Sequence, residues 1–498
     1  MTAAGHEKER PRLPETSSPG IPAAHPHLTR GLGFWQATAI NITQIVGAGV
    51  FATIPLILGV LPAAYALLAW LVAGVLILAD SMVWGELGAA LPAAGGSYHF
   101  LLESYGRSRW GRLMSFLFVW QILISGPLEV GSGLAAAAQF SSDIDPAFKQ
   151  FNRDHTVRAE FEIGNDQTVG MAIGPSRVFG FLLGLLILVL LYRRVTEVGK
   201  LSVVFLLGVL GVLAWVLVEG AIRFDPVLAF DTTLSGDERP GHFDRALGIG
   251  MGFAIYSYLG YYNVCYLGGE VRDPARIIPR SILASAFAVI VLFTLVHLAI
   301  TGVVPWREAA EEKDNLTAKF MRDVRGQWAA TLVTVCLVGS CFASAFSGLL
   351  GYSRVPYAAA REGHFFRWFA AVHPRHNIPH RALLLLGALV LFWSFFDLDT
   401  IIKGLIATRI LEQFIAQVLA VVLLRRLQPD RPRPWRMWLF PLPCAVALVG
   451  WMFVYVTLGG LFIAIGAGTL LAGLIVFLVW SKRRGDWPFR VNTPRNSK

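Results

Sequence analysis

The sequence predicts an all-α integral membrane protein with twelve transmembrane helices, and its composition and the lengths of its apolar runs lead to this prediction. Of the 498 residues, 55% are hydrophobic and only 15% are charged, and the mean hydropathy is +0.56. A soluble domain requires a more polar surface than this. The apolar residues form continuous runs long enough to cross about 30 Å of hydrocarbon, whereas a β-barrel would show short segments of alternating hydrophobicity.

Twelve runs qualify as spans because each is a continuous, mostly apolar stretch. They cover residues 32–58, 62–91, 114–140, 178–192, 201–218, 246–267, 282–304, 328–350, 382–396, 401–424, 437–458 and 461–480. The net charge of +10 fits this topology: if both termini are cytoplasmic, most of the 43 lysines and arginines lie in cytoplasmic segments. We therefore expect a protein of the cytoplasmic (inner) membrane that contacts the lipid bilayer and binds no nucleic acid.

The spans divide the chain into two blocks of five helices, followed by two further helices. Because five is an odd number, the second block must be inverted relative to the first. The leader is polar and rich in proline, so we expect it to be disordered. The predicted divisions are a cytoplasmic tail at 1–30, a first block at 31–222 with an outside loop at 141–175, an outside loop at 223–245, a second block at 246–426, the last two helices at 427–481, and a basic cytoplasmic tail at 482–498.

Two outside segments have patterns of their own. VRAEFEIGNDQTVGMAI contains two alternating runs around Gly164, Asn165 and Asp166, which predicts a β-hairpin. WREAAEEKDNLTAKFMRDV predicts a short amphipathic helix at the surface. The four cysteines lie in or beside spans without the spacing of a metal or disulfide site, and no catalytic motif accompanies them. We therefore expect no metal, no organic cofactor and no enzymatic activity.

The stretch NITQIVGAGVFATIP places Gly47 and Gly49, on either side of Ala48, in the middle of the first span. Glycine permits a break in a helix, and a broken helix is tolerated in hydrocarbon only where its backbone lines a cavity or meets a ligand. The half-helix after the break would offer free N–H groups to an anion, and the carbonyl groups before it would suit an ammonium group. The sixth span has its own glycine cluster and can break in the same way around Ser257 to Gly260.

Interrupted spans at corresponding places in two halves of a chain are typical of a transporter's binding site. Two crossed, broken helices could meet both charges of an α-amino acid without any charged side chain. The alternative is that the glycines only allow the helices to pack closely.

Three separated stretches resemble, in the right order, motifs of the amino acid–polyamine–organocation permeases. IVGAGVF resembles the first-span motif I-G-x-G-I-F, YSYLGYYNVCYLGGEVRDPARIIPRSI resembles the sixth span with its following loop, and GYSRVPYAAAREGHFFRWFAAVHPRHNIPHRALLL resembles the loop after the eighth span. GLIATRILEQFIAQVLAVVLLRR is similar to the tenth span of the L-type amino acid transporter branch. The chain departs from the family pattern at Tyr256 and Tyr261, which replace Phe and Trp, at Gly269, which replaces Glu, and at Phe366, which replaces Pro.

This resemblance implies a leucine-transporter-type fold of two inverted five-helix repeats plus two C-terminal helices, with broken first and sixth helices. It implies an amino acid or polyamine substrate, bound between spans one, three, six, eight and ten and moved by alternating access. The implied contacts are the amides of Gly47, Ala48 and Gly49 for a carboxylate, the carbonyls near Ile45 and Tyr256 for an ammonium group, and Ser257, Tyr258 and Gly260 beside them. Tyr256 would also form the outer gate, and the loop containing Glu270 would help to close the cytoplasmic side.

Ionisable residues inside spans are costly and are candidates for function. Glu129 follows Pro127 in the third span. It either accepts hydrogen bonds from backbone groups freed by a proline kink or faces the substrate and selects an amine. Arg409 and Glu412 lie three residues apart in the tenth span, which favours an ion pair within that helix, with pairing between spans as the alternative. Asn41 is either a polar group in helix packing or a ligand of the substrate.

The coupling ion stays open at this point. Some proton-coupled members of the family carry a lysine in the fifth span, and the corresponding position here falls near Val209, where there is none. Exchange, facilitated uptake, or coupling to a proton or to sodium through Ser340 and Ser344 remain. We expect a secondary-active or exchange transporter of amino acids. The alternatives are a transporter of polyamines or cationic amines that uses Glu129, and a nutrient sensor without transport.

Overall fold

The computed structural model describes residues 31–47, 49–93, 95–107, 110–162, 168–193, 198–233, 242–312, 314–376 and 378–485. The predicted tail at 1–30, most of the tail at 482–498, Ala48 and the turn from Gly164 to Asp166 lie outside these residues. The elements are α1 (Phe34–Ile45), α2 (Gly49–Leu58), α3 (Ala63–Ala90), α4 (Ser97–Ser104), α5 (Trp110–Ser141), α6 (Pro146–Asp154), β1 (Val157–Glu162), β2 (Thr168–Ile173), α7 (Pro175–Tyr192), α8 (Val198–Ile222), α9 (Pro226–Ala229), α10 (Phe243–Tyr258), α11 (Asn263–Tyr266), η1 (Gly268–Glu270), α12 (Pro274–Thr301), α13 (Trp306–Glu311), α14 (Leu316–Arg325), α15 (Gln327–Arg361), η2 (Arg367–Ala370), α16 (His380–Trp393), α17 (Leu398–Arg409), η3 (Ile410–Ile415), α18 (Ala416–Leu427), α19 (Leu442–Thr457) and α20 (Gly460–Arg483).

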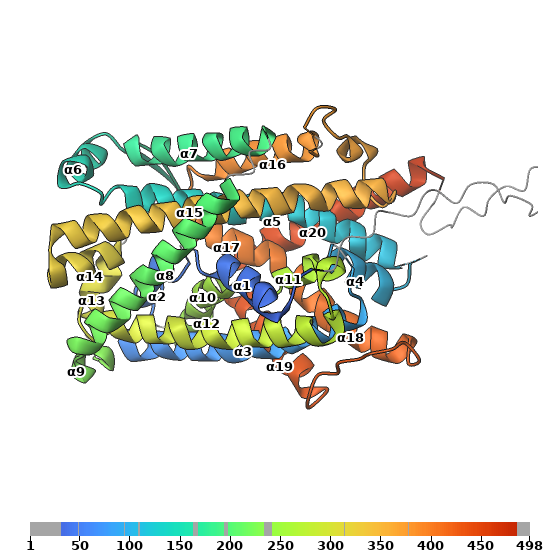
Figure 1. The fold of residues 1–498 in the computed structure, drawn as a ribbon, viewed down its shortest axis with the longest axis horizontal. Coiled ribbons are helices and arrows are strands. Elements are labelled where there is room, and N and C mark those ends of the chain that lie inside the picture. Colours follow the sequence, from blue (N-terminus) through green and yellow to red (C-terminus); the bar gives the residue numbers. More distant parts are fainter. Residues whose placement is uncertain are drawn as a thin grey trace, which may run out of the picture.

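The long helices form two packed pairs with the interrupted helices between them. Figure 1 shows α3 beside α12 along one side and α5 beside α15 along the other, with α1, α10 and α17 between the two pairs. Helix α8 crosses obliquely from α12 to α15, and α7 packs with α16 on the outer side of α5. This arrangement places both predicted breaks in the middle of the molecule.

The structure is that of a helical membrane protein. Among the described residues, seven helices are long and apolar enough to cross a membrane, and the bent pair of α1 and α2 would make an eighth. The part of α8 from Leu207 to Ile222, α16 and α19 are shorter apolar helices, and α10 with α11 is interrupted. The count of twelve spans and the inverted repeat stay predictions.

The two ends of the bundle differ. At one end, which we call the hairpin end, lie the strands β1 and β2 with α6, α13 and α14; the opposite α4 end carries α4 (Figure 1). The predicted hairpin is present, with Val157 opposite Ile173 in an antiparallel pair. The predicted amphipathic helix was wrong as a single element, because the Asn315 side chain accepts a hydrogen bond from the amide of Ala318 (3.0 Å) and starts a second helix, α14.

Both predicted interruptions are present. The first span divides into α1 and α2, which are bent by 45° relative to each other. The sixth breaks after Tyr258, within the predicted stretch from Ser257 to Gly260, and the turn is made by Gly260, whose φ of +115° is a left-handed conformation that favours glycine. A third irregularity was not predicted. The tenth span passes through the π-helical segment η3 between α17 and α18.

Candidate functional site

The two broken helices meet at their breaks. Gly49 begins α2, and a Cβ built on it would lie 3.0 Å from Cα of Ser257 in α10, so a larger residue would push the helices apart. The hydroxyl groups of Thr53 and Ser257 are 2.7 Å apart and share a hydrogen bond. On the other side of the break, Gly260 approaches Gln44 of α1 so closely that a Cβ there would lie 2.8 Å from Cγ of Gln44.

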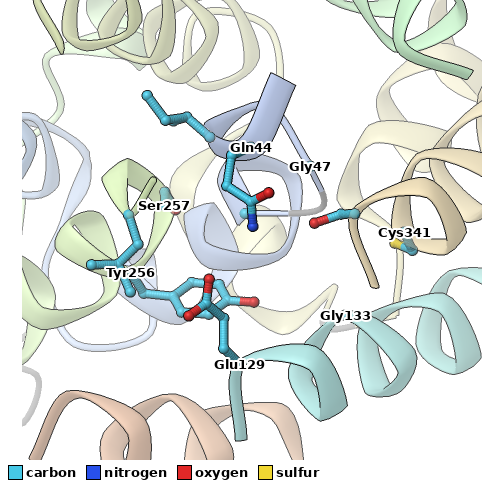
Figure 2. Close-up of a pocket in the computed structure, with 11 residues that line it drawn as sticks. Gln44, Gly47, Glu129, Gly133, Tyr256, Ser257 and Cys341 are labelled. Atoms are coloured by element: carbon cyan, nitrogen blue, oxygen red, sulfur yellow. The ribbon is translucent and has the colours of Figure 1, made fainter. Parts of the chain in front are cut away.

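A cavity of about 40 Å³ lies where these breaks meet. Figure 2 shows Gln44 and Glu129 reaching into it from opposite sides, with the ring of Tyr256 beside Glu129. Small-molecule pockets usually enclose roughly 300–1,000 Å³, so a bound ligand would require the lining to open. The lining residues come from α1, α2, α5, α10 and α15 and their breaks: Gln44, Ile45, Gly47, Gly49, Glu129, Gly133, Tyr256, Ser257, Leu259, Cys341 and Ser344.

The backbone groups at the breaks are partly occupied. The amide of Gly47 donates to the carbonyl of Ile45 (2.9 Å), so this amide is not free for a carboxylate in this conformation. The amide of Leu259 donates to the carbonyl of Tyr256 (3.3 Å). Each carbonyl oxygen has a second lone pair and can still accept from an ammonium group. The first amides of α2, starting at Gly49, have no acceptor within their own helix and are the remaining donors for an anion.

Glu129 belongs to a charged cluster beside the cavity. Its Oε2 forms an ion pair with the guanidinium group of Arg409 and accepts a hydrogen bond from the hydroxyl of Tyr352 (2.5 Å). Arg409 also donates to the hydroxyl groups of Tyr352 (3.0 Å) and Tyr262 (3.3 Å). The two predicted alternatives for Glu129 were bonds to backbone groups freed by Pro127 and a free carboxylate that faces the substrate. The carboxylate does face the cavity, but the guanidinium group of Arg409 neutralises its charge, which neither alternative included.

The expected ion pair between Arg409 and Glu412 within one helix was wrong. Arg409 is 1% exposed and turns towards α5, where Glu129 lies, so the pairing is between spans. The π-helical segment begins at Ile410, so the α-helical spacing that would bring the two side chains to one face is interrupted between them.

The side chains of Asn41 and Tyr256 connect α10 and α11, the two parts of the broken sixth span, to neighbouring helices. The Asn41 side chain accepts from the amide of Val264 in α11 (2.9 Å) and donates to Ser285 in α12 (3.2 Å), so Asn41 connects helices. The hydroxyl of Tyr256 shares a hydrogen bond with Ser132 of α5 (2.8 Å).

Comparison with known proteins decides the family. A sequence model of the family described as amino acid permease matches residues 32–479, nearly the whole chain. This chain belongs to the amino acid permease family. The resemblance found in the three motifs is thereby confirmed, and the permease is a transporter by family and not an enzyme.

Three relatives show the range of the family. The branched-chain amino acid permease of Bacillus subtilis is 23% identical over 92% of this permease and 94% of that protein. The serine/threonine exchanger of Bacillus subtilis is 26% identical over 92% of this permease and 98% of that protein. The vacuolar cationic amino acid transporter 4 of Arabidopsis thaliana is 24% identical over 81% of this permease and 65% of that protein.

The permease brings most of the residues predicted for its site to the cavity, but not all. Those that line it are Ile45, Gly47, Gly49, Glu129, Tyr256, Ser257 and Ser344. Ala48 lies outside the described residues. The others do not line the cavity: Tyr258 packs against Trp70 and Phe293, Gly260 packs against Gln44, Ser340 lies one turn from Ser344, and Glu270 lies at the start of α1.

Glu270 makes its contact through the backbone. Its carbonyl oxygen accepts from the amides of Gly31 (2.9 Å) and Leu32 (3.0 Å), and the amide of Arg272 donates to Leu32 (3.0 Å). The start of α1 is therefore fastened to the segment between η1 and α12, and the fastening does not use the carboxylate of Glu270.

Sequence reasoning missed four lining residues of the permease, Gln44, Gly133, Leu259 and Cys341. Gln44 carried a signal, since it is an amide inside an apolar span, three residues before Gly47. Cys341 lies on the face of α15 that includes Ser344. The sequence prediction named only the hydroxyl groups of Ser340 and Ser344 in this helix, because these can bind an ion. Leu259 lies within the break predicted from Ser257 to Gly260 but was not named as a lining residue, and Gly133 carried no signal in the sequence.

Proposed function

We propose that the chain is a secondary-active or exchange transporter that moves amino acids across the cytoplasmic membrane by alternating access. The observation that carries the proposal is the cavity at which the breaks of α1–α2 and α10–α11 meet. The substrate carboxylate would bind the first amides of α2, where the helix dipole is positive. The ammonium group would bind the carbonyl oxygens of Ile45 and Tyr256, with Glu129 beyond them.

Helix packing supports the proposed inverted repeat of twelve spans. Counting the spans as predicted, the second lies against the seventh (α3 and α12), the third against the eighth (α5 and α15), and the fourth against the ninth (α7 and α16) (Figure 1). The first and sixth spans also meet, through α2 and α10, so four of the five predicted pairs are in contact, which fits a pseudo-twofold relation. In the proposal, α1, α3, α10 and α12 rock against α5, α7, α15 and α16, and both termini are cytoplasmic at the α4 end of an inner-membrane protein.

The charge at the cavity favours a neutral amino acid over a polyamine. Polyamines lack a carboxylate and need several acidic side chains. Glu129 is the acidic residue of the cavity lining, and Arg409 neutralises it. A cationic amino acid is the second candidate, because the Glu129 carboxylate still faces the cavity and one relative is named as a cationic amino acid transporter. The coupling ion, a proton or sodium, belongs to the proposal as well. Of the two serines predicted for sodium, Ser344 lines the cavity and Ser340 does not.

The test is thermal unfolding of the purified protein in detergent with a panel of L-amino acids and polyamines. A ligand that binds only the folded state at 100 times its Kd stabilises it by about 2.7 kcal/mol. We expect neutral amino acids such as L-threonine or L-leucine to raise the melting temperature, and Glu129→Gln to keep this response. Stabilisation by lysine or spermidine alone, lost in Glu129→Gln, would move the proposal to cation transport.

Flux then distinguishes a transporter from a sensor built on the same scaffold. Proteoliposomes preloaded with the stabilising amino acid should exchange it for the radiolabelled form. Binding without any flux would overturn the transport mechanism and leave a nutrient sensor.

A further inference from the structure

A buried carboxylate that the proposed mechanism does not use lies in the tenth span. Glu412 is 3% exposed and belongs to η3, the π-helical segment between α17 and α18. A π-helical turn widens a helix by one residue and is often found at functional sites. This segment follows Arg409 directly, so it adjoins the residue that neutralises Glu129 at the cavity.

Glu412 differs from the other buried carboxylates. Asp80 accepts hydrogen bonds from Tyr261 and Trp451, and Glu86 pairs with Arg425 in two bonds of 2.7 and 2.6 Å. Within the described part of the chain, the carboxylate of Glu412 forms neither an ion pair nor a hydrogen bond, and its Oε1 is fully buried.

The surroundings of Glu412 provide neutral polar groups rather than a cation. Gln413 in the same segment and Gln417 on α18 follow Glu412 in the chain, and both are buried and uncharged. Tyr105, after the end of α4, donates to the carbonyl of Ala416 (3.0 Å), and its pKa is raised, first by burial and then by the neighbouring Glu412. None of these groups carries a positive charge, so none can compensate an ionised carboxylate at Glu412.

The titratable groups on the elements packed against η3 are engaged elsewhere or distant. Helices α5, α17, α18 and α19 contact η3. On α5 and α17, Glu129 pairs with Arg409, Arg112 is engaged at the first turn of α5, and Lys403 pairs with Asp399 (3.4 Å) on the first turn of α17. On α18 and α19, Arg425 pairs with Glu86, Arg426 is exposed, Tyr455 donates to the carbonyl of Ile463 (2.9 Å), and Cys444 is a free thiol. An ionised carboxylate buried without a partner is strongly unfavourable. In this conformation Glu412 therefore carries a proton.

We infer that Glu412 is a proton-binding site of this permease, and that Arg409 couples it to the substrate cavity. The inference rests on the proposed transport function and names its coupling ion. When Glu412 releases its proton to water at the α4 end, a negative charge appears in the π-helical segment that begins directly after Arg409. In the low-dielectric interior this charge attracts the guanidinium group of Arg409 and weakens its pairing with Glu129. Movement of Arg409 would leave the Glu129 carboxylate at the cavity without its counter-ion and release the hydroxyl of Tyr262. The uncompensated negative charge would oppose binding of a neutral amino acid through its carboxylate, so the form with Glu412 protonated binds that substrate more tightly.

This coupling is thermodynamically reciprocal. If release of the proton from Glu412 changes the affinity of the cavity for substrate, substrate binding must change the proton affinity of Glu412 by the same factor. Substrate and proton binding are then linked without a lysine in the fifth span.

The experiment uses the full chain in proteoliposomes with the pH dye pyranine inside. An inward gradient of L-threonine or L-leucine is applied, and radiolabelled exchange of the same amino acid is measured in parallel. The wild type should acidify the interior as the amino acid enters. Glu412→Gln mimics the protonated state, so it should keep exchange and lose the acidification. Asp80→Asn removes a buried carboxyl group that has its own partners, so it should keep the acidification.

Three results would overturn the inference. They are amino acid entry into wild-type liposomes without acidification, unchanged acidification in Glu412→Gln, and loss of acidification in Asp80→Asn with retention in Glu412→Gln. If Glu412→Gln does not fold, Glu412→Asp should keep the acidification with a shifted pH midpoint, and an unshifted midpoint would refute the assignment. Liposomes that move neither amino acid nor protons would instead refute the proposed function, and the inference with it.

Discussion

Removing Arg409 should destabilise the permease because it leaves a carboxylate beside the cavity without its cation. The guanidinium group is 1% exposed, pairs with Glu129 and donates to Tyr352 and Tyr262. Breaking a buried pair by removing one partner costs roughly 3–5 kcal/mol. The Glu129 side chain is 15% exposed, so water in the cavity relieves part of the penalty. We therefore expect Arg409→Met to lower the free energy of unfolding by about 3 kcal/mol, near the lower limit of that range.

A double-mutant cycle isolates this pair. Glu129→Gln alone leaves Arg409 buried without a counter-ion and should also destabilise. The double variant removes both charges, and replacing a buried pair by neutral groups is often neutral or stabilising. Its stability should lie close to that of the wild type, giving a coupling free energy of at least about 2 kcal/mol between the two sites. Denaturation in detergent, followed by tryptophan fluorescence, measures the four proteins.

A surface pair provides the matched control. Lys319 and Glu308 at the hairpin end are 2.6 Å apart, but the Glu308 side chain is 52% exposed. Exposed pairs contribute about 0–1 kcal/mol, so the cycle of Lys319→Met and Glu308→Gln should show little coupling. If the effects of Arg409→Met and Glu129→Gln were simply additive, the two side chains would not depend on each other, and the assigned pairing would be refuted.

Three further predictions concern selectivity, the helix contact and pH. Arg409→Met should shift the thermal response of the protein from L-threonine towards lysine and spermidine, because the Glu129 carboxylate is then free; no shift would place Glu129 out of reach of the ligand. Gly49→Ala brings a Cβ within 3.0 Å of Cα of Ser257 and should cost about 1–3 kcal/mol and weaken ligand binding, whereas Gly468→Ala, with no atom within 4 Å, should do neither. Burial lowers the pKa of His364 from its ordinary 6.5, so the folded state binds fewer protons and stability falls as pH drops below about 6.5. His364→Gln should reduce that fall in melting temperature, and an unchanged pH profile would contradict it.

Local features of this fold could be predicted from short stretches of the sequence. Gly47 and Gly49 predicted the break between α1 and α2, because glycine can adopt non-helical backbone conformations without a steric penalty. The alternating runs on either side of a polar turn predicted the hairpin. These features depend on neighbours in the chain, so a pattern of a few residues specifies them.

Features that depend on how helices face each other could not be predicted. The spacing of Arg409 and Glu412 suggested a pair, but the partner of Arg409 is Glu129, 280 positions earlier in the chain. Which face of α17 turns towards α5 is set by packing of the whole bundle. The π-helical segment, which changes that face, had no turn residue to indicate it. Gly133 reaches the cavity for the same reason, through the position of its helix.

The polar contacts of the broken α10–α11 segment fall into two groups, according to whether the partner helix would move with this segment in the proposed mechanism. Asn41 of α1 accepts from the amide of Val264, and Asp80 of α3 accepts from the hydroxyl of Tyr261. Both helices belong to the group that would move together with α10 in the proposed mechanism, so these contacts can persist through the transport cycle.

The opposite contacts join the segment to helices that would not move with it. Tyr256 bonds to Ser132 of α5, and Tyr262 bonds to Arg409 at the end of α17, which packs on α5. Rocking of the two groups must break these two bonds, and both involve residues at or next to the cavity. A ligand that replaced the bond of Tyr256 to Ser132, or that drew Glu129 away from Arg409, would lower the cost of that motion. In the proposed mechanism, the contacts that close the cavity are therefore those through which substrate and proton would bias its opening.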